Sequence, residues 1–550
     1  MDSYTVADHL VDRLAELGVD RVFGVPGDYS LGLLDHITHH PSVTWTGTTN
    51  ELNAGYAADG YARLRGIAAL CTTFGVGELS AINAIAGSYA EHVPVVHIVG
   101  SPALAKQAQH RPLHHTLGDG EFGHFAGMYA DITCARGALT EQNAPAEIDR
   151  VLTAVRDRRL PGYLLVPADV AQVPVDRATA PLPSASDATD AEALAGFTDA
   201  ARRLLDQAPD RGGIGVLAGL LVHRFGAADA LAAVLAAGVP HAVTPWAKSL
   251  VDESAPGFAG TYSGAAGSTE PTRRAIEDAA ALILAGVQFT DLNSGLFTQR
   301  ITRSRTIDLG ARAAAVGSAV FAPVELADAL TALAPLVAGR PAAALAPPPP
   351  VDPGGPVPDG EPLSQAVLWQ EVADRLNAGD IVLADQGTSF YGMAPHPIPS
   401  GVTFVGQPLW ASIGYTLPAL IGACTAAPGR RGVLLVGDGA AQMTATELST
   451  VLRLELPVVV LVVDNDGYTV ERAIHGPDEP YNDITQWDWT ALPAAFGAPG
   501  AAAMRVTTAG ELRAALAGPP GFTLVQAVVP RDDVPDLLGT LTRVLGGAPR

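Results

Sequence analysis

Two short aliphatic runs in the last third of the chain constrain its fold most strongly. The run Val433 to Val436 ends in Gly437-Asp438-Gly439, and the run Val458 to Val463 leads into Asn465-Asp466-Gly467. Aliphatic runs bordered by glycine or proline are typical of buried strands, and Ala441 to Leu454 between them has the length of a crossover helix. The segment therefore predicts a βαβ unit whose two strands lie parallel in one sheet.

The ends of these strands predict a cation site. Parallel neighbours end at the same sheet edge, so Asp438 and Asn465, 27 positions apart (465 − 438), should converge there. A carboxylate, an amide oxygen and a backbone carbonyl suit a hard cation such as Mg2+. Either motif alone is equally well explained as an ordinary turn. Together they resemble the thiamine diphosphate motif, which implies Asp438, the Asn465 side chain and the Gly467 carbonyl as metal ligands and places Gly439 in the cofactor site.

Composition narrows the class of partner. The formal charge is −23, from 34 basic and 57 acidic residues, whereas nucleic acid and anionic membranes favour clustered Lys and Arg. We therefore expect a small-molecule substrate, no nucleic acid and no membrane. The amino terminus lacks the pattern of a signal peptide, and no apolar run reaches the ~18 residues of a transmembrane helix. These features, with the scattered Cys71, Cys134 and Cys424, predict a soluble, cytoplasmic protein with unpaired thiols.

The chain is too long for one hydrophobic core. Its 550 residues, at about 100 to 200 per domain, allow several domains, and composition breaks favour three. We predict an α/β protein with three doubly wound parallel-sheet domains at 1–175, 190–345 and 363–550. Residues 346–362, which begin with Pro347 to Pro350 after a single alanine, are expected to form an extended, exposed Pro/Gly-rich linker.

Local patterns place the first elements of these domains. Thr5 is expected to cap a helix, with Asp8 completing a T-x-x-D box and Gly18 ending it. Aliphatic runs predict further strands at Arg21 to Val25, Ala68 to Thr73, Val93 to Val99, Tyr163 to Val166, Gly213 to Ala218, Ala281 to Val287, Thr306 to Leu309 and Ile381 to Ala384.

Three further segments carry candidate chemistry. Glu51 precedes a helix of small residues, where a lone glutamate is usually solvated surface. His114-His115 lie in a Gly-rich loop, and adjacent histidines point different ways from most backbones. Two solvated loop histidines would explain the pair, and a metal site is disfavoured because no third ligand follows at a suitable spacing. Glu471 comes six residues after Asn465, at the start of a predicted helix toward Ile474.

Taken in order, these residues resemble the thiamine diphosphate-dependent 2-oxo acid decarboxylases. The resemblance covers nearly the whole chain and is carried by Asp28, Glu51, His114, His115, Asp438, Asn465 and Glu471. Segments such as FGVPGDYSL, NELNAGYAADGYAR, LHHTLGDGEF and GYTVERAIHGP are most similar to bacterial indolepyruvate and branched-chain 2-oxo acid decarboxylases. The resemblance implies thiamine diphosphate and Mg2+ as cofactors, and a lyase that converts a 2-oxo acid to an aldehyde and CO2.

The family implies catalytic roles for five residues. Glu51 would keep the N1′ nitrogen of the aminopyrimidine protonated. Asp28, His114, His115 and Glu471 would line the pocket above the thiazolium and handle protons there. Glu471 would lie close to the departing carboxylate, either as a repelling charge or as a protonated group with a raised pKa.

The family also implies the remaining cofactor contacts. Thr388 would help to hold the diphosphate, the Ala411 carbonyl would accept a hydrogen bond from the 4′-amino group, and Ile413 would wedge between the two rings. Two positions depart from the usual pattern. Ala411 stands where glycine is usual, and Asp464 stands where asparagine is usual.

The substrate is expected to be bulky. The resemblance implies that its side chain is bounded by Gln386, Phe390, Val470, Ile474, Leu541 and Leu545. Phe390 and Val470 stand where pyruvate-specific relatives carry Trp and Ile, which enlarges the pocket. Indolepyruvate, phenylpyruvate or a branched-chain 2-oxo acid is therefore favoured over pyruvate, with broad specificity because apolar pockets discriminate weakly by size.

We also consider three alternative functions and an oligomeric state. The alternatives are a carboligase similar to acetohydroxyacid synthase, a pyruvate decarboxylase and a non-catalytic thiamine-binding paralogue. The histidine pair and Glu471 argue against the first, and the intact Glu51 and metal motif argue against the last. In the family the cofactor lies across a dimer interface, so we expect a homodimer with shared active sites that assembles into a homotetramer.

Overall fold

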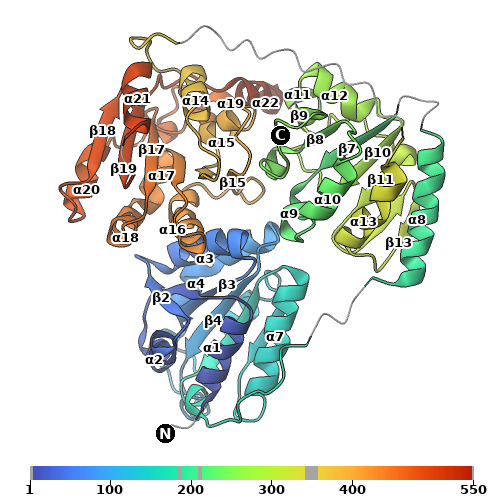
Figure 1. Ribbon diagram of the computed structural model, residues 1–550. Coiled ribbons are helices and arrows are strands. Elements are labelled where there is room, and N and C mark those ends of the chain that lie inside the picture. The colour runs from blue at the N-terminus through green and yellow to red at the C-terminus, as the bar shows by residue number, and fades with distance from the viewer. Residues whose placement is uncertain (1–3, 184–188, 209–212, 341–356, 519, 548–550) are drawn as a thin grey trace.

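The computed structural model describes residues 4–183, 189–208, 213–340, 357–518 and 520–547. Three α/β domains follow one another along the chain, and Figure 1 shows the N-terminal domain in blue, the central domain in green to yellow and the C-terminal domain in orange to red. The predicted α/β class with three domain-sized sheets is confirmed. The predicted strands are present, with ends shifted by at most two residues.

The N-terminal domain has a six-stranded sheet in the order β2-β1-β3-β4-β6-β5, and all its neighbouring strands are parallel. Its strands are β1 Arg21–Gly24, β2 Thr44–Gly47, β3 Ala68–Thr73, β4 Val95–Ser101, β5 Ala135–Ala138 and β6 Gly162–Pro167. Its helices are α1 Val6–Glu16, α2 Leu31–His39, α3 Glu51–Arg65, α4 Val76–Ala90, α5 Leu104–Gln107, α6 His124–Met128 and α7 Ala144–Arg158. Successive β3 side chains enter opposite cores: Leu70 packs with α3 and α4, and Ala69 with α1, α2 and α7.

The central domain has a seven-stranded sheet in the order β13-β12-β11-β10-β7-β8-β9. Its strands are β7 Ile214–Ala218, β8 His241–Val243, β9 Phe258–Thr261, β10 Ala281–Ala285, β11 Thr306–Leu309, β12 Ala314–Val316 and β13 Ala319–Phe321. Its helices are α8 Ala191–Asp206, α9 Leu220–Arg224, α10 Ala228–Leu235, α11 Gly264–Gly267, α12 Glu270–Glu277 and α13 Leu326–Val337. A fully parallel sheet was predicted, but this sheet is mixed. Strands β12 and β13 form an antiparallel hairpin whose tight turn contains Gly317 at φ +57°.

The C-terminal domain has a six-stranded sheet in the order β15-β14-β16-β17-β19-β18, again with parallel neighbours. Its strands are β14 Ile381–Ala384, β15 Thr403–Val405, β16 Gly432–Gly437, β17 Val458–Asp464, β18 Ala502–Val506 and β19 Thr523–Val528. Its helices are α14 Gln365–Ala373, α15 Thr388–Met393, α16 Thr416–Ala426, α17 Asp438–Thr444, α18 Leu448–Arg453, α19 Thr469–Ile474, α20 Leu492–Ala495, α21 Ala509–Leu516 and α22 Asp536–Gly547.

Two sequence patterns can be compared directly with the structure. The capping box of α1 forms as predicted, since the Asp8 N–H donates to Thr5 Oγ1 and the Thr5 N–H donates to Asp8 Oδ2. The crossover predicted at 441–454 differs in two respects. It begins at Asp438, and a 3-10 turn at Ala445–Glu447 divides it into α17 and α18. Asp438 therefore lies in the first turn of a helix.

The N-terminal and C-terminal domains share a core through two helices, α3 and α16. Glycines permit their close approach. A Cβ added to Gly60 of α3 would lie 2.2 Å from the Ala419 carbonyl oxygen, and one added to Gly422 of α16 would lie 1.8 Å from the Ala57 carbonyl oxygen. The small residues after Glu51 thus serve packing between domains.

The domain borders are partly outside the described residues. The part of the predicted linker that lies outside the described residues is 346–356, which includes Pro347 to Pro350. Residues 357–362 are mostly exposed but are not a free spacer, because Arg513 bonds Asp359 at 2.6 Å and the Gly510 N–H donates to the Asp359 carbonyl at 2.9 Å. At the first border, Leu182 is buried in the N-terminal core, so packing reaches beyond residue 175.

The cysteines agree with the expectation of unpaired thiols. Cys71, Cys134 and Cys424 are all free thiols. In the described ranges, we find no helix that combines the length and the apolar character needed to cross a membrane.

Candidate active site

A cavity of about 320 Å3 lies at the carboxyl edge of the C-terminal sheet. The residues predicted for the metal, for the diphosphate and for much of the substrate side line it together: Gln386, Thr388, Ala411, Ile413, Asp438, Gly439, Asn465, Gly467, Val470, Glu471, Ile474 and Leu541. They meet here because β14, β16 and β17 are adjacent and end at this edge.

Asp438, Asn465 and the Gly467 carbonyl, together called the cation group, meet at the ends of β16 and β17. Asp438 is buried, and its carboxylate accepts the N–H groups of Gly439 at 2.7 Å and Gly467 at 3.1 Å. One amide atom of Asn465 lies 3.1 Å from Asp438 Oδ1 and 3.2 Å from the Gly467 carbonyl oxygen. The hydrogen bonds favour the amide nitrogen at this place, where it donates to both oxygens while the amide oxygen accepts from the Thr469 hydroxyl at 2.9 Å. A bound cation would instead require the amide oxygen to face it. A carboxylate, an amide oxygen and a carbonyl fit a hard divalent cation.

The charge of this group also favours a cation. Burial, assisted by the nearby carboxylates of Asp464 and Asp466, raises the pKa of Asp438 to about 7, while the hydrogen bonds from the Gly439 and Gly467 N–H groups act in the opposite direction. A bound cation would reverse this effect by favouring the ionised carboxylate. Asp464 stands where asparagine is usual. It accepts a hydrogen bond from Gln526 on β19 at 2.7 Å and is not a member of the cation group.

Glycine residues leave space for a ligand beside the cation group. A Cβ on Gly439 would lie 2.7 Å from the Tyr468 ring, so a glycine is needed there. Thr388 opens α15 directly after Gly387 at φ +130°. Ile413 projects into the cavity and is half-buried. This edge could hold a diphosphate against exposed N–H groups.

Ala411 occupies a conformation that glycine adopts more easily. Its φ is +56°, in the left-handed region that costs a residue with a Cβ about 1 to 2 kcal/mol. We expect Ala411→Gly to raise the free energy of unfolding by about 1 kcal/mol, since the greater freedom of glycine in the unfolded chain offsets part of the gain. Denaturant unfolding would test this; an unchanged or lower stability would contradict it.

The apolar end of the cavity differs from the prediction at two adjacent positions. Phe390 does not line it: the ring is buried against Phe404 and against Gly406, because residue 390 lies on the opposite face of α15. Its neighbour Tyr391 lines the cavity instead and accepts a hydrogen bond from Gln386 at 3.0 Å. The Leu545 side chain belongs to the part that the structure does not describe.

Leu538 and Leu292 are among the lining residues that were not identified from the sequence. Leu538 lies on α22 one turn before Leu541, and the apolar spacing of that helix is a signal that could have found it. Leu292 comes from the central domain, far away in sequence, and no local pattern indicates it. The central domain therefore contributes to the cavity wall.

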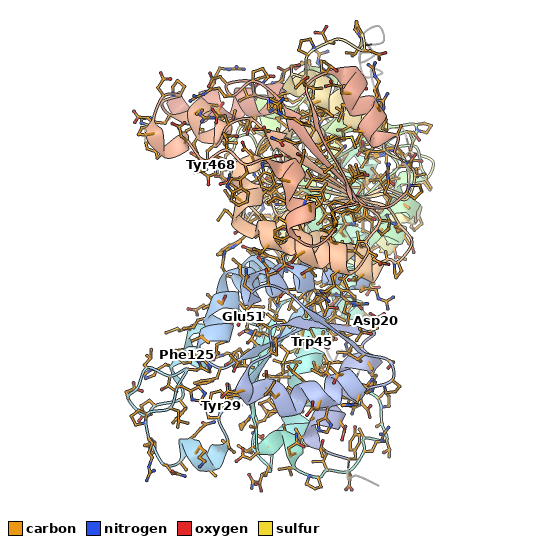
Figure 2. All side chains as sticks on the ribbon, turned by 90° about the vertical axis from the view of Figure 1, so that its left-hand side faces the viewer. Asp20, Tyr29, Trp45, Glu51, Phe125 and Tyr468 are labelled. Atoms are coloured by element: carbon orange, nitrogen blue, oxygen red, sulfur yellow. The ribbon has the colours of Figure 1, made fainter. Side chains whose placement is uncertain are left out.

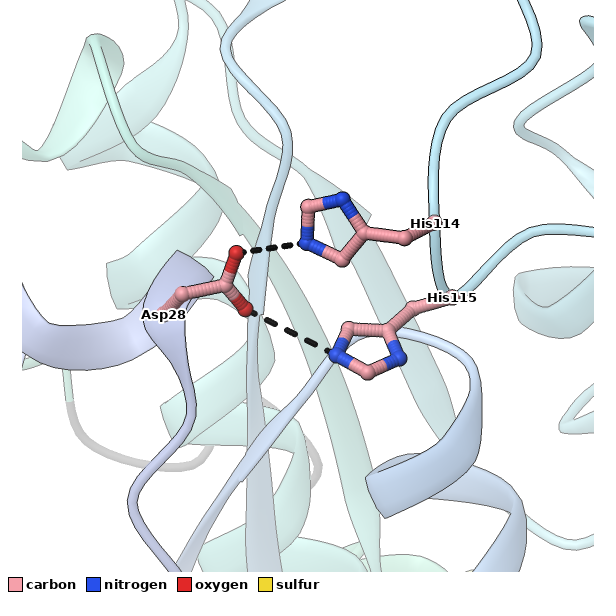
Figure 3. Close-up of side chains that lie close together, drawn as sticks. All are labelled: Asp28, His114 and His115. Atoms are coloured by element: carbon pink, nitrogen blue, oxygen red, sulfur yellow. Dashed lines mark hydrogen bonds and ion pairs between the residues drawn. The ribbon is translucent and has the colours of Figure 1, made fainter.

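A second group of candidate residues lies on the N-terminal domain. His114 Nε2 is 2.6 Å from Asp28 Oδ2, and His115 Nε2 is 3.7 Å from Asp28 Oδ1 (Figure 3). The Tyr29 ring stacks on His114 at a centroid distance of 4.9 Å. Burial acts to raise the pKa of Asp28, but the hydrogen bond and charge of His114 outweigh it, so the pKa is lowered. The arrangement can hold and transfer protons.

The structure corrects two expectations about the histidine pair. The two rings do not diverge, because His115 has φ +63° and turns its ring back toward Asp28. A third potential ligand is also present, since Asp28 approaches from another loop and all three ligand atoms lie within 4.8 Å of one another. Sequence spacing could not reveal this contact, which crosses 86 positions.

Glu51 is the first residue of α3, and Asn50 caps this helix through a hydrogen bond from the Asn53 N–H at 2.8 Å. Its side chain is half-buried against the turn before α4, where a Cβ on Gly77 would lie 3.0 Å from Glu51 Oε1. Figure 2 shows Glu51 on the N-terminal domain and Tyr468, which lines the cavity, on the C-terminal domain.

One chain therefore carries two separate groups of candidate residues. In the described part of the chain, no residue of the N-terminal domain lines the C-terminal cavity. Large apolar side chains are exposed close to both groups in sequence: Val76 is 56%, Leu117 61% and Met443 58% exposed. Exposed apolar groups beside functional residues are typical of surfaces that meet a partner.

Family models of thiamine pyrophosphate enzymes match all three domains. The N-terminal TPP binding domain matches residues 4–121, the central domain matches 201–335, and the C-terminal TPP binding domain matches 385–525. The first match contains Asp28, Glu51 and the histidine pair, and the last contains the cation group.

Similar proteins align over nearly the whole chain. The alpha-keto-acid decarboxylase of Mycobacterium tuberculosis is 55% identical over 549 residues, which cover 98% of this chain and 96% of the relative. That of Mycobacterium ulcerans is 55% identical over 547 residues (98% and 95%), and that of Mycobacterium avium is 54% identical over 559 residues (100% and 98%). The chain therefore belongs to the thiamine diphosphate-dependent 2-oxo acid decarboxylase family.

Proposed function

We propose that this enzyme decarboxylates bulky 2-oxo acids, such as indolepyruvate, phenylpyruvate or a branched-chain 2-oxo acid, with thiamine diphosphate and Mg2+. The observation that carries the proposal is the cavity, in which Asp438, Asn465 and Gly467 lie at one end and Val470, Ile474 and Leu541 line the wall. Polar groups at one end and an aliphatic wall suit a charged cofactor beside an apolar substrate side chain.

The cofactor residues have separate tasks in this proposal. Asp438, Asn465 and the Gly467 carbonyl would hold the cation, and Thr388 would contact the diphosphate. When bound, thiamine diphosphate supplies a nucleophilic carbon and accepts the electron pair that remains when CO2 leaves. Glu51 would hold a proton on the aminopyrimidine nitrogen, as a carboxylate at hydrogen-bond distance can.

The other candidate residues would control protons and charge near the substrate. His114 and His115, oriented by the ionised Asp28, would deliver the proton that replaces CO2. Glu471 opens α19 and lines the cavity, so it would lie near the substrate carboxylate. Tyr391 and Leu292 would close the apolar end.

Aldehyde release is the test of this function. The purified protein would be assayed with thiamine diphosphate and Mg2+, through a coupled alcohol dehydrogenase, on indolepyruvate, phenylpyruvate, 4-methyl-2-oxopentanoate and pyruvate. We expect a higher kcat/KM on the three bulky acids. Preference for pyruvate would contradict the substrate assignment, and carboligation products without aldehyde would favour a synthase.

Val470→Ile should shift this preference. Val470 lines the cavity, so a methyl group added to its side chain would take up space on the substrate side. We expect kcat/KM for indolepyruvate to fall about tenfold and that for pyruvate to change little, because one methylene in an apolar pocket is worth ~1 to 3 kcal/mol. The matched control is Val320→Ile, at an exposed site of the central domain. Equal losses on both substrates would contradict a role in size selection.

We propose further that the active unit is a homodimer, with Glu51 of one chain facing the cation group of the other, and that dimers form a homotetramer. The separation of the two groups on one chain and the exposed Val76, Leu117 and Met443 support shared sites. Mixing inactive Glu51→Gln and Glu471→Gln chains under subunit exchange should restore about a quarter of the activity, since half of the dimers then hold one intact site. No recovery despite verified exchange would contradict the shared site.

A further inference from the structure

Residues 73–77, which comprise the end of β3, the turn at 74–75 and the first two residues of α4, contact two of the candidate catalytic residues; this segment is called the β3–α4 turn. A Cβ added to Gly75 would lie 1.9 Å from the His115 carbonyl oxygen, so the backbones of this turn and of the histidine loop are in direct contact. A Cβ added to Gly77 would lie 3.0 Å from Glu51 Oε1. Any shift of the turn would therefore displace His115 or Glu51.

The same turn also contacts the segment that carries Asp28. A Cβ added to Gly27 would lie 2.4 Å from Thr73 Cβ, so the residue before Asp28 packs on the end of β3. Gly75 has φ +65° and ψ −91°, a backbone conformation that glycine adopts without the strain a Cβ would cause. Such a conformation needs surrounding contacts to hold it in place.

The side chain of Glu78 supplies contacts that hold Gly75 in this conformation. Its side chain is completely buried, and Oε1 accepts the Gly75 N–H at 2.8 Å while Oε2 accepts the Tyr163 hydroxyl at 2.7 Å. The Glu78 carbonyl oxygen also accepts the Tyr129 hydroxyl. Tyr163 belongs to β6 and Tyr129 directly follows α6, so Glu78 ties the turn to two other parts of the domain.

Among the described residues, no charged side chain bonds to the Glu78 carboxyl group, whose partners are the Gly75 N–H and the Tyr163 hydroxyl. Burial raises the pKa of Glu78 to about 7, while the hydrogen bonds from Gly75 and Tyr163 act in the opposite direction. The His97 ring lies 5.2 Å from the Tyr129 ring and 5.8 Å from the Tyr163 ring, and burial lowers its pKa to about 3, so it stays neutral. The cost of burying a carboxyl group here is not offset by an ion pair, which indicates that its hydrogen bonds matter.

We propose that Glu78 is a positioning residue that sets Glu51 and His115 for catalysis by locking the turn at Gly75. The inference rests on the proposed function, because it gives these two residues their roles. Glu78 touches neither substrate nor cofactor in this account. Its effect passes through backbone contacts at Gly75 and Gly77, where a displacement of about 1 Å can cost up to about 100-fold in rate.

The simpler reading is that Glu78 only caps a helix. It is the third residue of α4, where a glutamate commonly caps the helix start, and loss of a cap costs about 1 kcal/mol of stability. Glu511 is a matched control, since it occupies the same place in the capping box of α21, which Thr508 begins. Its side chain is exposed and lies in the C-terminal domain.

The experiment compares Glu78→Ala, Glu78→Gln, Tyr163→Phe and Glu511→Ala in the assembled, cofactor-loaded enzyme. Turnover is measured per bound thiamine diphosphate, and exchange of the thiazolium C2 proton in D2O reports on Glu51 without any 2-oxo acid. We expect Glu78→Ala to lower kcat about 30-fold and to slow exchange about tenfold, with KM changed less than about threefold. Glu78→Gln keeps an acceptor for Gly75 and should stay within about threefold of the original rate.

The outcomes separate positioning from capping. A lower Tm for Glu78→Ala with unchanged kcat and exchange per bound cofactor, as we expect for Glu511→Ala, would overturn the proposal. If Glu78→Ala does not fold, Tyr163→Phe decides, since it removes only the hydroxyl that anchors Oε2. A loss of about fivefold in turnover would support the proposal, and an unchanged rate would overturn it. Absence of aldehyde from the unmodified enzyme would refute the proposed function instead, and C2 exchange would still test Glu51.

Discussion

Replacing Glu51 by glutamine should lower kcat about 1,000-fold while thiamine diphosphate still binds. Glutamine keeps the size and hydrogen-bonding capacity of Glu51 but cannot share a proton with a ring nitrogen, and such proton transfers contribute about 100- to 10,000-fold to enzyme rates. The half-buried side chain at the start of α3 can be replaced without disturbing a core. Steady-state kinetics and C2 exchange of the bound cofactor measure the effect.

The control for this substitution is Glu121→Gln. Glu121 lies on the same domain with a side chain that is 65% exposed, and it is not among the candidate catalytic residues. We expect its turnover to match that of the unmodified enzyme. A Glu51→Gln variant that retained more than about a tenth of the original kcat would show that another group holds the proton.

The second large effect is expected at the cation group. Asp438→Asn should weaken the Mg2+-dependent binding of thiamine diphosphate at least about 100-fold, because even groups that only support metal ligands change affinity by about 10- to 100-fold. The negative charge of Asp438 matters here because Asn465 and the Gly467 carbonyl, the other members of the cation group, are neutral. Calorimetric titration of the apo-protein with cofactor, with and without Mg2+, would measure it.

Asp464→Asn is the matched control for Asp438→Asn. This substitution restores the residue that is usual in the family. The carboxylate that it removes accepts a hydrogen bond from Gln526 and does not belong to the cation group. We expect cofactor affinity within about threefold of the original. EDTA should abolish turnover of the unmodified enzyme, and added Mg2+ should restore it. Equal losses for both substitutions would point to general disturbance of the sheet edge.

Particular residues show how far the sequence predicted the site. Asp438 and Asn465 could be placed together because each follows a recognisable strand and parallel neighbours must end at one edge. Asp28, His114 and His115 were selected through family resemblance, but their contact depends on the left-handed backbone of His115. Residue order carries no direct signal for that backbone angle.

The substrate wall shows where sequence reasoning failed. Phe390 and Tyr391 are adjacent and both aromatic, so local pattern does not decide which one faces the cavity. The choice depends on how α15 packs, with Phe390 filling the space above Gly406 and beside Phe404. Leu292 could not be selected because its approach depends on how the central domain lies against the C-terminal domain.

The sequence by itself determined the α/β class, the βαβ unit and the meeting of Asp438 with Asn465. These follow from hydrophobic periodicity and glycine positions, which act over a few residues and along one sheet. Only the tertiary structure decided that the candidate residues form two separate groups, that Tyr391 replaces Phe390, and that the buried Glu78 supports the turn beneath Glu51 and His115. Such features depend on side-chain packing between segments distant in sequence, whose geometry no local pattern specifies.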